Sequence, residues 1–269
     1  MKGGPTFALD AAAVDELVAR LGAERERPDQ LELPSVSHPK LTLDDAYGVQ
    51  RAVSRRLQVE GISVIGRKVG LVDPGAQARH GVQEPIAGRL YDHGLLPEGG
   101  RVDAVLRGHG RIECELAFLL GEDLSGPGVT GAHVLAATAG VAPAFELIED
   151  RLPTAATVAD MVADNCSGAG VMVGSALVAP SALDLTATGV VLEVDGQVVA
   201  TGASGAVMGN PTGAVAWLAN RLAALGERLH AGEIVLTGAV VPPLPVDHGR
   251  AITARFGGGL GPLSAVGTG

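Results

Sequence analysis

The stretch RIECELAFLL, residues 111–120, decides the fold. Glu113 and Glu115 stand two residues apart in it, so on a β-strand both carboxylates leave the same face, about 7 Å apart along the backbone. From Leu116 the stretch continues as unbroken apolar residues, which is typical of a strand covered on both sides. The sequence therefore predicts a strand inside a layered structure, with two carboxylates on one of its faces.

Paired carboxylates at this spacing have two interpretations. On a half-exposed strand they face water, whereas on a covered strand they cost several kcal/mol unless a cation or an arginine meets them. A hard divalent cation held by oxygen ligands is the simplest such partner. Glu113 and Glu115 are therefore candidate metal ligands.

A third acid stands in APAFELIEDR, residues 142–151. Glu146 lies among apolar residues there, whereas the charged residues that end the stretch resemble an ordinary surface turn. Glu146 is either paired with Arg111 or Arg151 in a salt bridge or is a metal ligand. Three carboxylates with waters would form a magnesium or manganese site that keeps positions open for a substrate.

Lysine occurs only at Lys2, Lys40 and Lys68. Lys68 lies in IGRKVGLV, residues 65–72, between strand-like apolar residues and two glycines. Either its stem is packed while its ammonium reaches solvent, or it is a cation that binds a substrate carboxylate or moves protons beside the metal.

The stretch VADNCSGAG, residues 162–170, offers an amide at Asn165 and a hydroxyl at Ser167 in a loop flanked by glycine. These groups are candidates for substrate binding, although Asn and Ser are also frequent in plain turns. The histidines show no tight ligand spacing and the motif G-x-S-x-G is absent, so neither a histidine metal site nor a serine hydrolase is indicated.

Composition narrows the function classes. With 269 residues, 46% of them apolar, the chain can bury the core of one large domain or two small ones, which excludes a disordered chain. A net charge of -10 makes nucleic acid and anionic membranes poor partners, and one Trp, two Tyr and four Phe are too few for base stacking. No glycine-rich nucleotide motif occurs. The expected partners are small molecules or proteins.

Cysteine usage and hydropathy favour a cytoplasmic location. Cys114 and Cys166 lack the C-x-x-C spacing and fit a reducing compartment. The first twenty residues lack the basic-then-apolar order of a signal peptide, and no run approaches the ~18 apolar residues of a membrane-spanning helix.

Helical periodicity dominates the first sixty residues. A helix is predicted over 10–22, capped by Asp10 and ended by Gly22, and a second one follows Thr42 after an irregular connector over 23–40. Further helices are predicted over 131–140 and 211–229.

Short β-rich segments occupy the rest of the chain. They are residues 62–72, 111–120, 170–178, 189–202, 233–240 and 251–256. Asp195-Gly196 lies between two β-branched runs and is the strongest hairpin signal. Without strict βαβ alternation, these segments indicate an α+β protein. We expect a single domain over 1–269, with a helical portion over 1–60 and a β-rich portion over 61–269.

Six motifs in fixed order resemble the 2-keto-4-pentenoate hydratase and 4-oxalocrotonate decarboxylase family, which belongs to the fumarylacetoacetase superfamily. The resemblance covers about residues 40–256 and is carried by GRKVGL, GVQEPIAGRLYD, RIECELAFLL followed by GEDL, PAFELIEDR, VADNCSGAG and LGERLHAGEIVLTGAV. It implies a mixed β-roll fold with N-terminal helices. It also implies Mg²⁺ or Mn²⁺ held by Glu113, Glu115 and Glu146, with Lys68 as the active-site lysine.

Family members act on short unsaturated 2-oxo acids, so the resemblance implies that the metal binds the substrate's carboxylate and 2-oxo oxygen and stabilises an enolate. Ile86 stands where the hydratases tend to have Asp, which favours decarboxylation of the 4-oxalocrotonate type. Hydration of 2-keto-4-pentenoate is the alternative. The candidate substrate-binding residues are Arg111, Asn165, Ser167 and Thr237.

Three departures from the family pattern leave the substrate open: Asn210 in place of His, Cys166 in place of Ala, and three prolines in VVPPLPV, residues 240–246. A related biosynthetic enzyme and an acylpyruvase-type C–C hydrolase are therefore further alternatives. Outside enzymes, the alternatives are a catalytically silent partner subunit and a metal-free core in which arginines pair with the carboxylates. We expect a homo-oligomer that acts on a small 2-oxo acid, with a pathway enzyme as a further possible partner.

Overall fold

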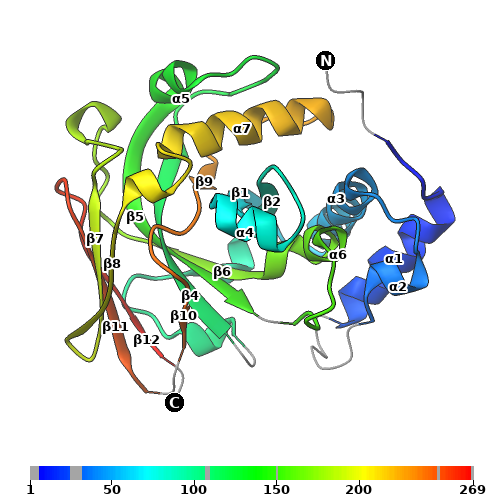
Figure 1. The fold of residues 1–269 in the computed structure, drawn as a ribbon, viewed down its shortest axis with the longest axis horizontal. Helices are drawn as coiled ribbons and strands as arrows, with labels where there is room; N and C mark the ends of the chain where they lie inside the picture. Colours follow the sequence, from blue (N-terminus) through cyan, green and yellow to red (C-terminus); the bar gives the residue numbers. More distant parts are fainter. Residues whose placement is uncertain (1–5, 25–31, 107–109, 150, 247–248, 268–269) are drawn as a thin grey trace.

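The structure is a computed structural model that describes residues 6–24, 32–106, 110–149, 151–246 and 249–267. The N-terminal helices lie at one side, a curled mixed sheet in the middle and a second, antiparallel sheet at the other side (Figure 1). The helices are α1 (Ala11–Glu24), α2 (Pro34–Ser37), α3 (Leu43–Val59), α4 (Pro74–Arg79), α5 (Gly131–Ala137), α6 (Val158–Ala163) and α7 (Pro211–Ala224). The predicted α+β class, with helices ahead of the strands, is confirmed.

The strands form two sheets. The central sheet contains, in spatial order, β2 (Ile86–Tyr91), β1 (Val64–Gly70), β9 (Ile234–Leu236), β4 (Gly110–Leu120), β5 (Thr138–Glu149), β6 (Gly168–Val173) and β3 (Leu95–Leu96), with β10 (Leu244–Pro245) beside β4. The second sheet contains β12 (Gly261–Val266), β11 (Ala251–Phe256), β7 (Gly189–Val194) and β8 (Gln197–Ala203).

The first helices begin where the sequence predicts. Thr42 and Asp45 form a capping box, in which the Thr42 hydroxyl accepts a hydrogen bond from the Asp45 N–H and the Asp45 carboxylate accepts one from the Thr42 N–H. At the start of α1 the carboxylate of Asp10 accepts a hydrogen bond from the Ala13 N–H. Both caps satisfy backbone donors that the first helical turn leaves free.

The predicted end of α1 at Gly22 is wrong, because the helix continues to Glu24. Gly22 does not adopt the left-handed conformation that ends helices, and a Cβ there would lie 3.1 Å from the guanidinium of Arg56. The absence of a side chain at Gly22 therefore lets α1 pack closely against Arg56 of α3. The connector predicted as irregular contains one helical turn, α2, which starts at Pro34.

The central sheet is strongly curled. Neighbouring strands lie about 4.8 Å apart, so β1 and β5, three places apart, would be separated by about 14 Å in a flat sheet. The ammonium of Lys68 on β1 nevertheless donates a hydrogen bond to Glu146 on β5. The sheet must therefore bend between these strands, and Figure 1 shows β4 and β5 as long, curved ribbons.

Small side chains cover the concave face beside this contact. A compact cluster shares the face of Lys68 and consists of Leu90, Ala117, Ala142, Ala144, Val171 and Leu236. Half of its members are alanines, so the bent strands can approach one another across it. The main core packs separately, between the sheets and the helices.

Strand β5 is missed by the sequence patterns. The predicted helix over 131–140 ends at Ala137, and β5 begins at the next residue. The strand contains Pro143 and two glutamates, residue types that are depleted in strands. Its pairing with β4 over nearly its whole length outweighs these local preferences.

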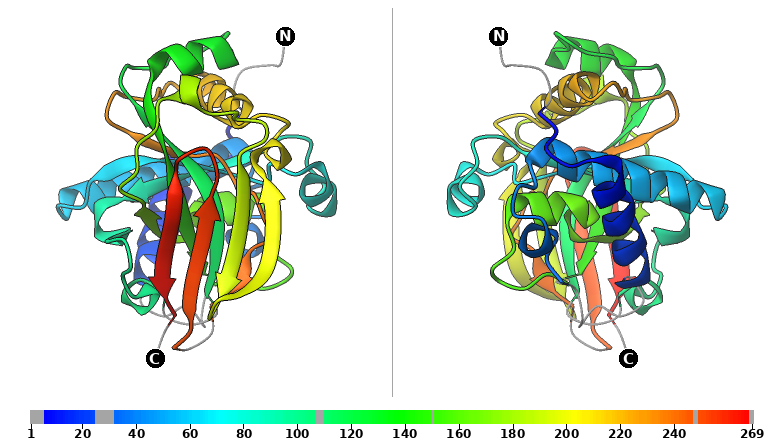
Figure 2. Two further views of the ribbon diagram at one scale, coloured as in Figure 1. Left: turned by 90° about the vertical axis from the view of Figure 1, so that its left-hand side faces the viewer. Right: turned by 90° about the vertical axis from the view of Figure 1, so that its right-hand side faces the viewer.

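The second sheet confirms the predicted hairpin. Asp195 and Gly196 both have positive φ angles, 49° and 77°, as a type I′ turn between β7 and β8 requires. Figure 2 shows this sheet facing the viewer in its left view and the N-terminal helices covering the opposite side in its right view. The central sheet, and the site that it carries, therefore lies between two covering layers.

Helix α7 is shorter than predicted, since it ends at Ala224 and not near residue 229. It begins at Pro211 behind Asn210, whose side chain accepts a hydrogen bond from the Thr212 N–H. Leu218, on the predicted apolar face, is fully buried. Within the described ranges, no helix has both the length and the apolar character needed to cross a membrane.

Gly66 allows β1 to pair with β9. A Cβ at this position would lie 2.0 Å from the Ile234 carbonyl oxygen, which is far inside van der Waals contact. We predict that Gly66→Ala lowers the free energy of unfolding by about 2 kcal/mol or more, because one of the two backbones must move. Gly189→Ala is the control, since a Cβ at Gly189 meets nothing within 4 Å. Urea unfolding checks both variants, and an equal effect of the two would contradict the prediction.

Candidate metal centre and active site

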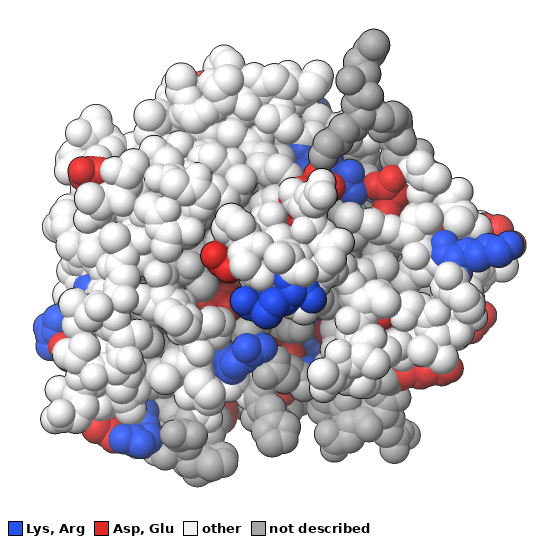
Figure 3. All heavy atoms as spheres, in the orientation of Figure 1, with Lys and Arg blue, Asp and Glu red and all other residues white. Residues whose placement is uncertain are grey.

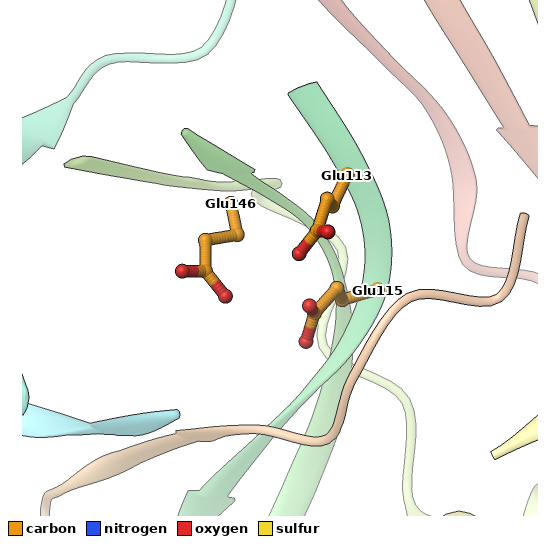
Figure 4. Close-up of side chains that lie close together, drawn as sticks. All are labelled: Glu113, Glu115 and Glu146. Atoms are coloured by element: carbon orange, nitrogen blue, oxygen red, sulfur yellow. The ribbon is translucent and has the colours of Figure 1, made fainter. Parts of the chain in front are cut away.

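Three glutamates meet on one face of β4 and β5. Glu113 and Glu115 are two residues apart on β4, and Glu146 on β5 is the register partner of Glu113. One carboxylate oxygen of each lies within 4.8 Å of those of the other two. Figure 4 shows the three side chains pointing toward a common centre. The spacing on one strand and the register of the next therefore build the cluster together.

Burial makes this cluster electrostatically costly. Glu115 and Glu146 are 0% and 1% exposed, while Glu113 is partly exposed toward a cavity. Burial raises the pKa of all three carboxyl groups, and the charge of Glu146 raises those of Glu113 and Glu115 further. The pKa of Glu113 rises to about 7, although Lys68 and Arg111 act against this rise. Without a cation, the cluster retains protons at neutral pH.

Lys68 supplies one of the positive charges that face the cluster. Its ammonium donates hydrogen bonds to Glu146 and, at 2.8 Å, to the carbonyl oxygen of Cys166. Burial is the largest single influence and lowers the pKa of Lys68, but Glu146, Cys166 and Glu113 together raise it more. The net shift is therefore upward, and the ammonium stays charged. Only 3% of the surface of Lys68 is exposed, so its ammonium does not reach solvent. The interpretation in which the stem is packed and the ammonium extends into water is therefore wrong.

The donor set fits a divalent cation. One oxygen of Glu115, Oε2, accepts a 2.6 Å hydrogen bond from the Gly238 N–H. The other, Oε1, is buried and accepts no hydrogen bond from any group outside the three glutamates in the described part of the chain. A buried carboxylate oxygen without a donor is a position for a cation, and an all-oxygen set suits Mg²⁺ or Mn²⁺.

Arginine pairing does not account for Glu146. Its ion-pair partner is Lys68, whereas Arg151 binds Glu149 and Asp164 at 3.5 and 3.1 Å. The side chains of Arg151 and Glu149 are only 7% and 6% exposed, so these two residues of the predicted surface turn point into the protein. The position of Asp150, between them, is outside the described residues.

A cavity of about 500 Å³ opens onto the cluster. Its floor carries Lys68 and Glu113, and its walls combine α4, β4 and the proline-rich stretch 239–243. Figure 3 shows a hollow in the middle of this face, with basic side chains at its margin and acidic atoms inside it. The cavity can therefore admit a small anionic molecule to the carboxylates.

The cavity receives two of the four predicted substrate-binding residues. Arg111 and Ser167 line it. The Asn165 side chain is instead bonded to the backbone of Arg89, and the Thr237 hydroxyl donates to the Leu116 carbonyl at 3.1 Å. Neither Asn165 nor Thr237 is among the cavity-lining residues.

Sequence reasoning missed several lining groups. Arg79 and the exposed Asp73 line the cavity from the two ends of α4. The sequence signal for this helix is Asp73 followed by Pro74, which is a helix cap followed by a first-turn proline. The Gly238 N–H that binds Glu115 is a backbone donor, for which residue type carries no signal. Ile86, the position that separates decarboxylase from hydratase in the resemblance, also lines the cavity.

Comparison with known proteins agrees with this geometry. The model of the fumarylacetoacetate (FAA) hydrolase C-terminal family matches residues 93–266. The chain is 39% identical to 4-oxalocrotonate decarboxylase of Pseudomonas sp. (strain CF600), over 87% of this chain and 90% of that one. It is 38% identical to 2-hydroxyhexa-2,4-dienoate hydratase of Comamonas testosteroni, over 79% and 82% of the two chains.

Among solved structures, 4-oxalocrotonate decarboxylase from Pseudomonas putida G7, complexed with magnesium and adipate, superimposes with a TM-score of 0.92. The two chains are 34% identical, and the match covers 97% of this chain and 99% of the other. The family match, the sequence identity and the shared architecture lead to one conclusion: this chain belongs to the fumarylacetoacetate hydrolase C-terminal family.

Proposed function

We propose that the chain is a divalent-metal-dependent lyase that acts on a short unsaturated 2-oxo acid, and that decarboxylation of the 4-oxalocrotonate type is its reaction. The observation that carries the proposal is the cluster of three buried glutamates facing Lys68 at the floor of a small-molecule cavity. The similarity to decarboxylases across most of the chain supports the choice of reaction.

Glu113, Glu115 and Glu146 would hold the metal, and Mg²⁺ or Mn²⁺ suits their oxygen atoms. The magnesium in the superimposable decarboxylase supports this assignment. When bound, such an ion supplies Lewis-acid polarisation of a 2-oxo group and stabilises negative charge that develops there.

Lys68 and the arginines would bind and orient the anionic substrate. The charged ammonium of Lys68 can bind a substrate carboxylate, or deliver a proton to the 2-oxo oxygen that receives the electron pair left behind by CO₂. Arg111 and Arg79 also line the cavity and suit a second carboxylate. Ser167 adds a neutral hydroxyl donor. These groups favour a substrate with two acidic ends.

The cavity walls favour decarboxylation over hydration. Val240, Val241 and Pro242 give the cavity an apolar wall, which would disfavour an ordered water molecule on that side. Adding water needs a positioned base, and burial raises the pKa of the Cys166 thiol to about 12, so that it stays protonated. Loss of CO₂ needs chiefly a place for the electron pair that remains.

Hydration is the second candidate, because a hydratase is among the relatives of comparable identity. We also propose that the chain acts as one domain, since the cavity combines residues from β1, α4, β4 and the stretch after β9. A homo-oligomer, with contact to a pathway enzyme, is the proposed assembly. Two buried, unpaired cysteines support a cytoplasmic location.

Metal binding should stabilise the native protein. At a hundredfold excess over Kd, Mg²⁺ should add about 2.7 kcal/mol, which corresponds to a rise in melting temperature of about 5–10 °C for a chain of this size. Glu115→Gln should abolish this rise, because it removes one of the three ligands. Thermal unfolding with Mg²⁺ and with EDTA measures the effect.

Glu149→Gln is the matched control for this experiment. Glu149 also lies on β5 and is also buried and ion-paired, but its partner is Arg151 and it is not a member of the cluster. This variant should lose stability and keep the full magnesium effect. An unchanged melting temperature of the native protein with every divalent cation would refute the metal site.

Stability without metal should depend on pH. The pKa of Glu113 rises from 4.5 to about 7 on folding, so this group binds its proton more tightly in the folded state. The contribution of this group to the free energy of unfolding is fully present below pH 4.5 and is lost as the pH rises through 7. In EDTA, the melting temperature should therefore fall by several degrees between pH 5 and pH 8, and Mg²⁺ should reverse the fall. A Glu113→Gln variant should show a smaller fall, and equal slopes for both proteins would count against this origin.

Activity identifies the reaction. With Mg²⁺ and 4-oxalocrotonate, the native protein should release CO₂, and Lys68→Met should lower kcat by about 10²–10⁴-fold because the proton donor is lost. Turnover of 2-hydroxypenta-2,4-dienoate by addition of water, without CO₂ release from 4-oxalocrotonate, would make the protein a hydratase. No turnover of either substrate, together with intact metal binding, would support a silent partner subunit.

A further inference from the structure

We infer that Asn165 is a positioning residue for Lys68, and that it acts through the turn at residues 165–167. This inference rests on the proposed function only where it assigns Lys68 a role in turnover. The Asn165 side chain does not line the cavity, so its role differs from the substrate contact expected from the sequence. It works instead through the Cys166 carbonyl, which accepts a hydrogen bond from the Lys68 ammonium.

The turn has an unfavourable backbone. Asn165, Cys166 and Ser167 have φ angles of 57°, 53° and 59°, so three consecutive residues with side chains adopt the left-handed conformation. Such residues are uncommon singly, and a run of three persists only where surrounding contacts hold it. The conformation turns the Cys166 carbonyl toward Lys68.

The contacts that hold the turn come from the outer edge of β2. The Asn165 Oδ1 accepts a hydrogen bond from the Arg89 N–H at 2.8 Å, and the Asn165 Nδ2 donates one to the Arg89 carbonyl at 2.9 Å. The Cys166 thiol donates to the Ala87 carbonyl at 3.2 Å. The side chain of Asn165 thus pairs with β2 as a neighbouring strand would, and it fixes the turn relative to the sheet.

Two glycines leave the room that this arrangement needs. A Cβ on Gly88 would lie 3.0 Å from both the Asn165 carbonyl oxygen and the Cε of Lys68. A Cβ on Gly168 would lie 3.2 Å from the Asn165 side-chain nitrogen. The Lys68 stem, the turn and β2 are therefore in direct contact, and a displacement of the turn must displace the ammonium.

Asn165→Gly tests the inference. Glycine adopts a φ of 57° without strain, so this variant removes the side-chain hydrogen bonds and leaves the backbone conformation accessible. Reductive methylation of the folded protein, mapped by mass spectrometry, reports the accessibility of Lys68, with the exposed Lys40 as an internal reference. We expect methylation of Lys68 to rise several-fold. In the metal-loaded enzyme, we expect kcat to fall by about tenfold to a hundredfold while KM changes less than about threefold, because orientation and not affinity is lost.

Asn220→Ala is the matched control. Asn220 on α7 also braces a backbone, with its Oδ1 accepting from the Val129 N–H and its Nδ2 donating to the Val129 carbonyl, both at 2.9 Å. It makes the same pair of bonds away from Lys68. The variant should lose stability but leave methylation of Lys68 and kcat as in the native protein.

Asn165→Asp gives a second variant of the same position, should the glycine variant fail to fold. The aspartate keeps the acceptor for the Arg89 N–H but loses the donor to the Arg89 carbonyl, so both readouts should fall between the native and glycine values. Native methylation and native kcat in both Asn165 variants would overturn the inference, as would equal changes in Asn220→Ala. Absence of turnover in the native protein overturns the proposed function alone, because methylation of Lys68 needs no substrate.

Discussion

The structure depends on the burial of three carboxylates beside one ammonium. If all four groups were ionised, the cluster of Glu113, Glu115 and Glu146 with Lys68 would carry a net charge of −2 in a region that excludes most water. Protons or a divalent cation must supply the missing positive charge, because isolated buried charges are too costly. The raised pKa values of the carboxyl groups indicate that protons supply this charge when no metal is bound. The buried Oε1 of Glu115, which lacks a donor outside the three glutamates in the described part of the chain, indicates where a cation would bind.

The curl of the central sheet follows from the same constraint. Lys68 reaches Glu146 only because β1 and β5 bend toward each other across β9 and β4. The bend requires small residues inside it, which Ala117, Ala142 and Ala144 provide, and a close approach at β1, which Gly66 allows. These residues contact no substrate in the proposed mechanism. They belong to the site because the charge pair cannot form on a flat sheet.

The sequence predicts the members of the cluster better than their arrangement. The spacing of Glu113 and Glu115 places them on one face, and the apolar neighbours of Glu146 mark it as buried. The register that sets Glu146 opposite Glu113 arises from β5, a strand that Pro143 hides from propensity rules. The sequence does not predict the roles of Asn165 and Thr237 either. Their hydrogen-bond partners are the backbones of Arg89 and Leu116, which are 76 and 121 residues away in the chain. Long-range backbone partners leave no mark on local composition.

Of the three departures from the family pattern, one lies away from the cavity and two line it. Asn210 caps α7 and lies outside the residues described as lining the cavity, so its change from His concerns the start of a helix. Cys166 and the proline-rich wall at 240–243 line the cavity directly. The wall is fixed to β4 through the Val240 N–H and the Cys114 carbonyl, 2.9 Å apart, and it follows the Gly238 donor to Glu115. Cavity shape and the cluster are thus set by one continuous stretch of chain. Of these three departures, therefore, Cys166 and the wall can act on substrate preference by direct contact, while the glutamates and Lys68 stay in place.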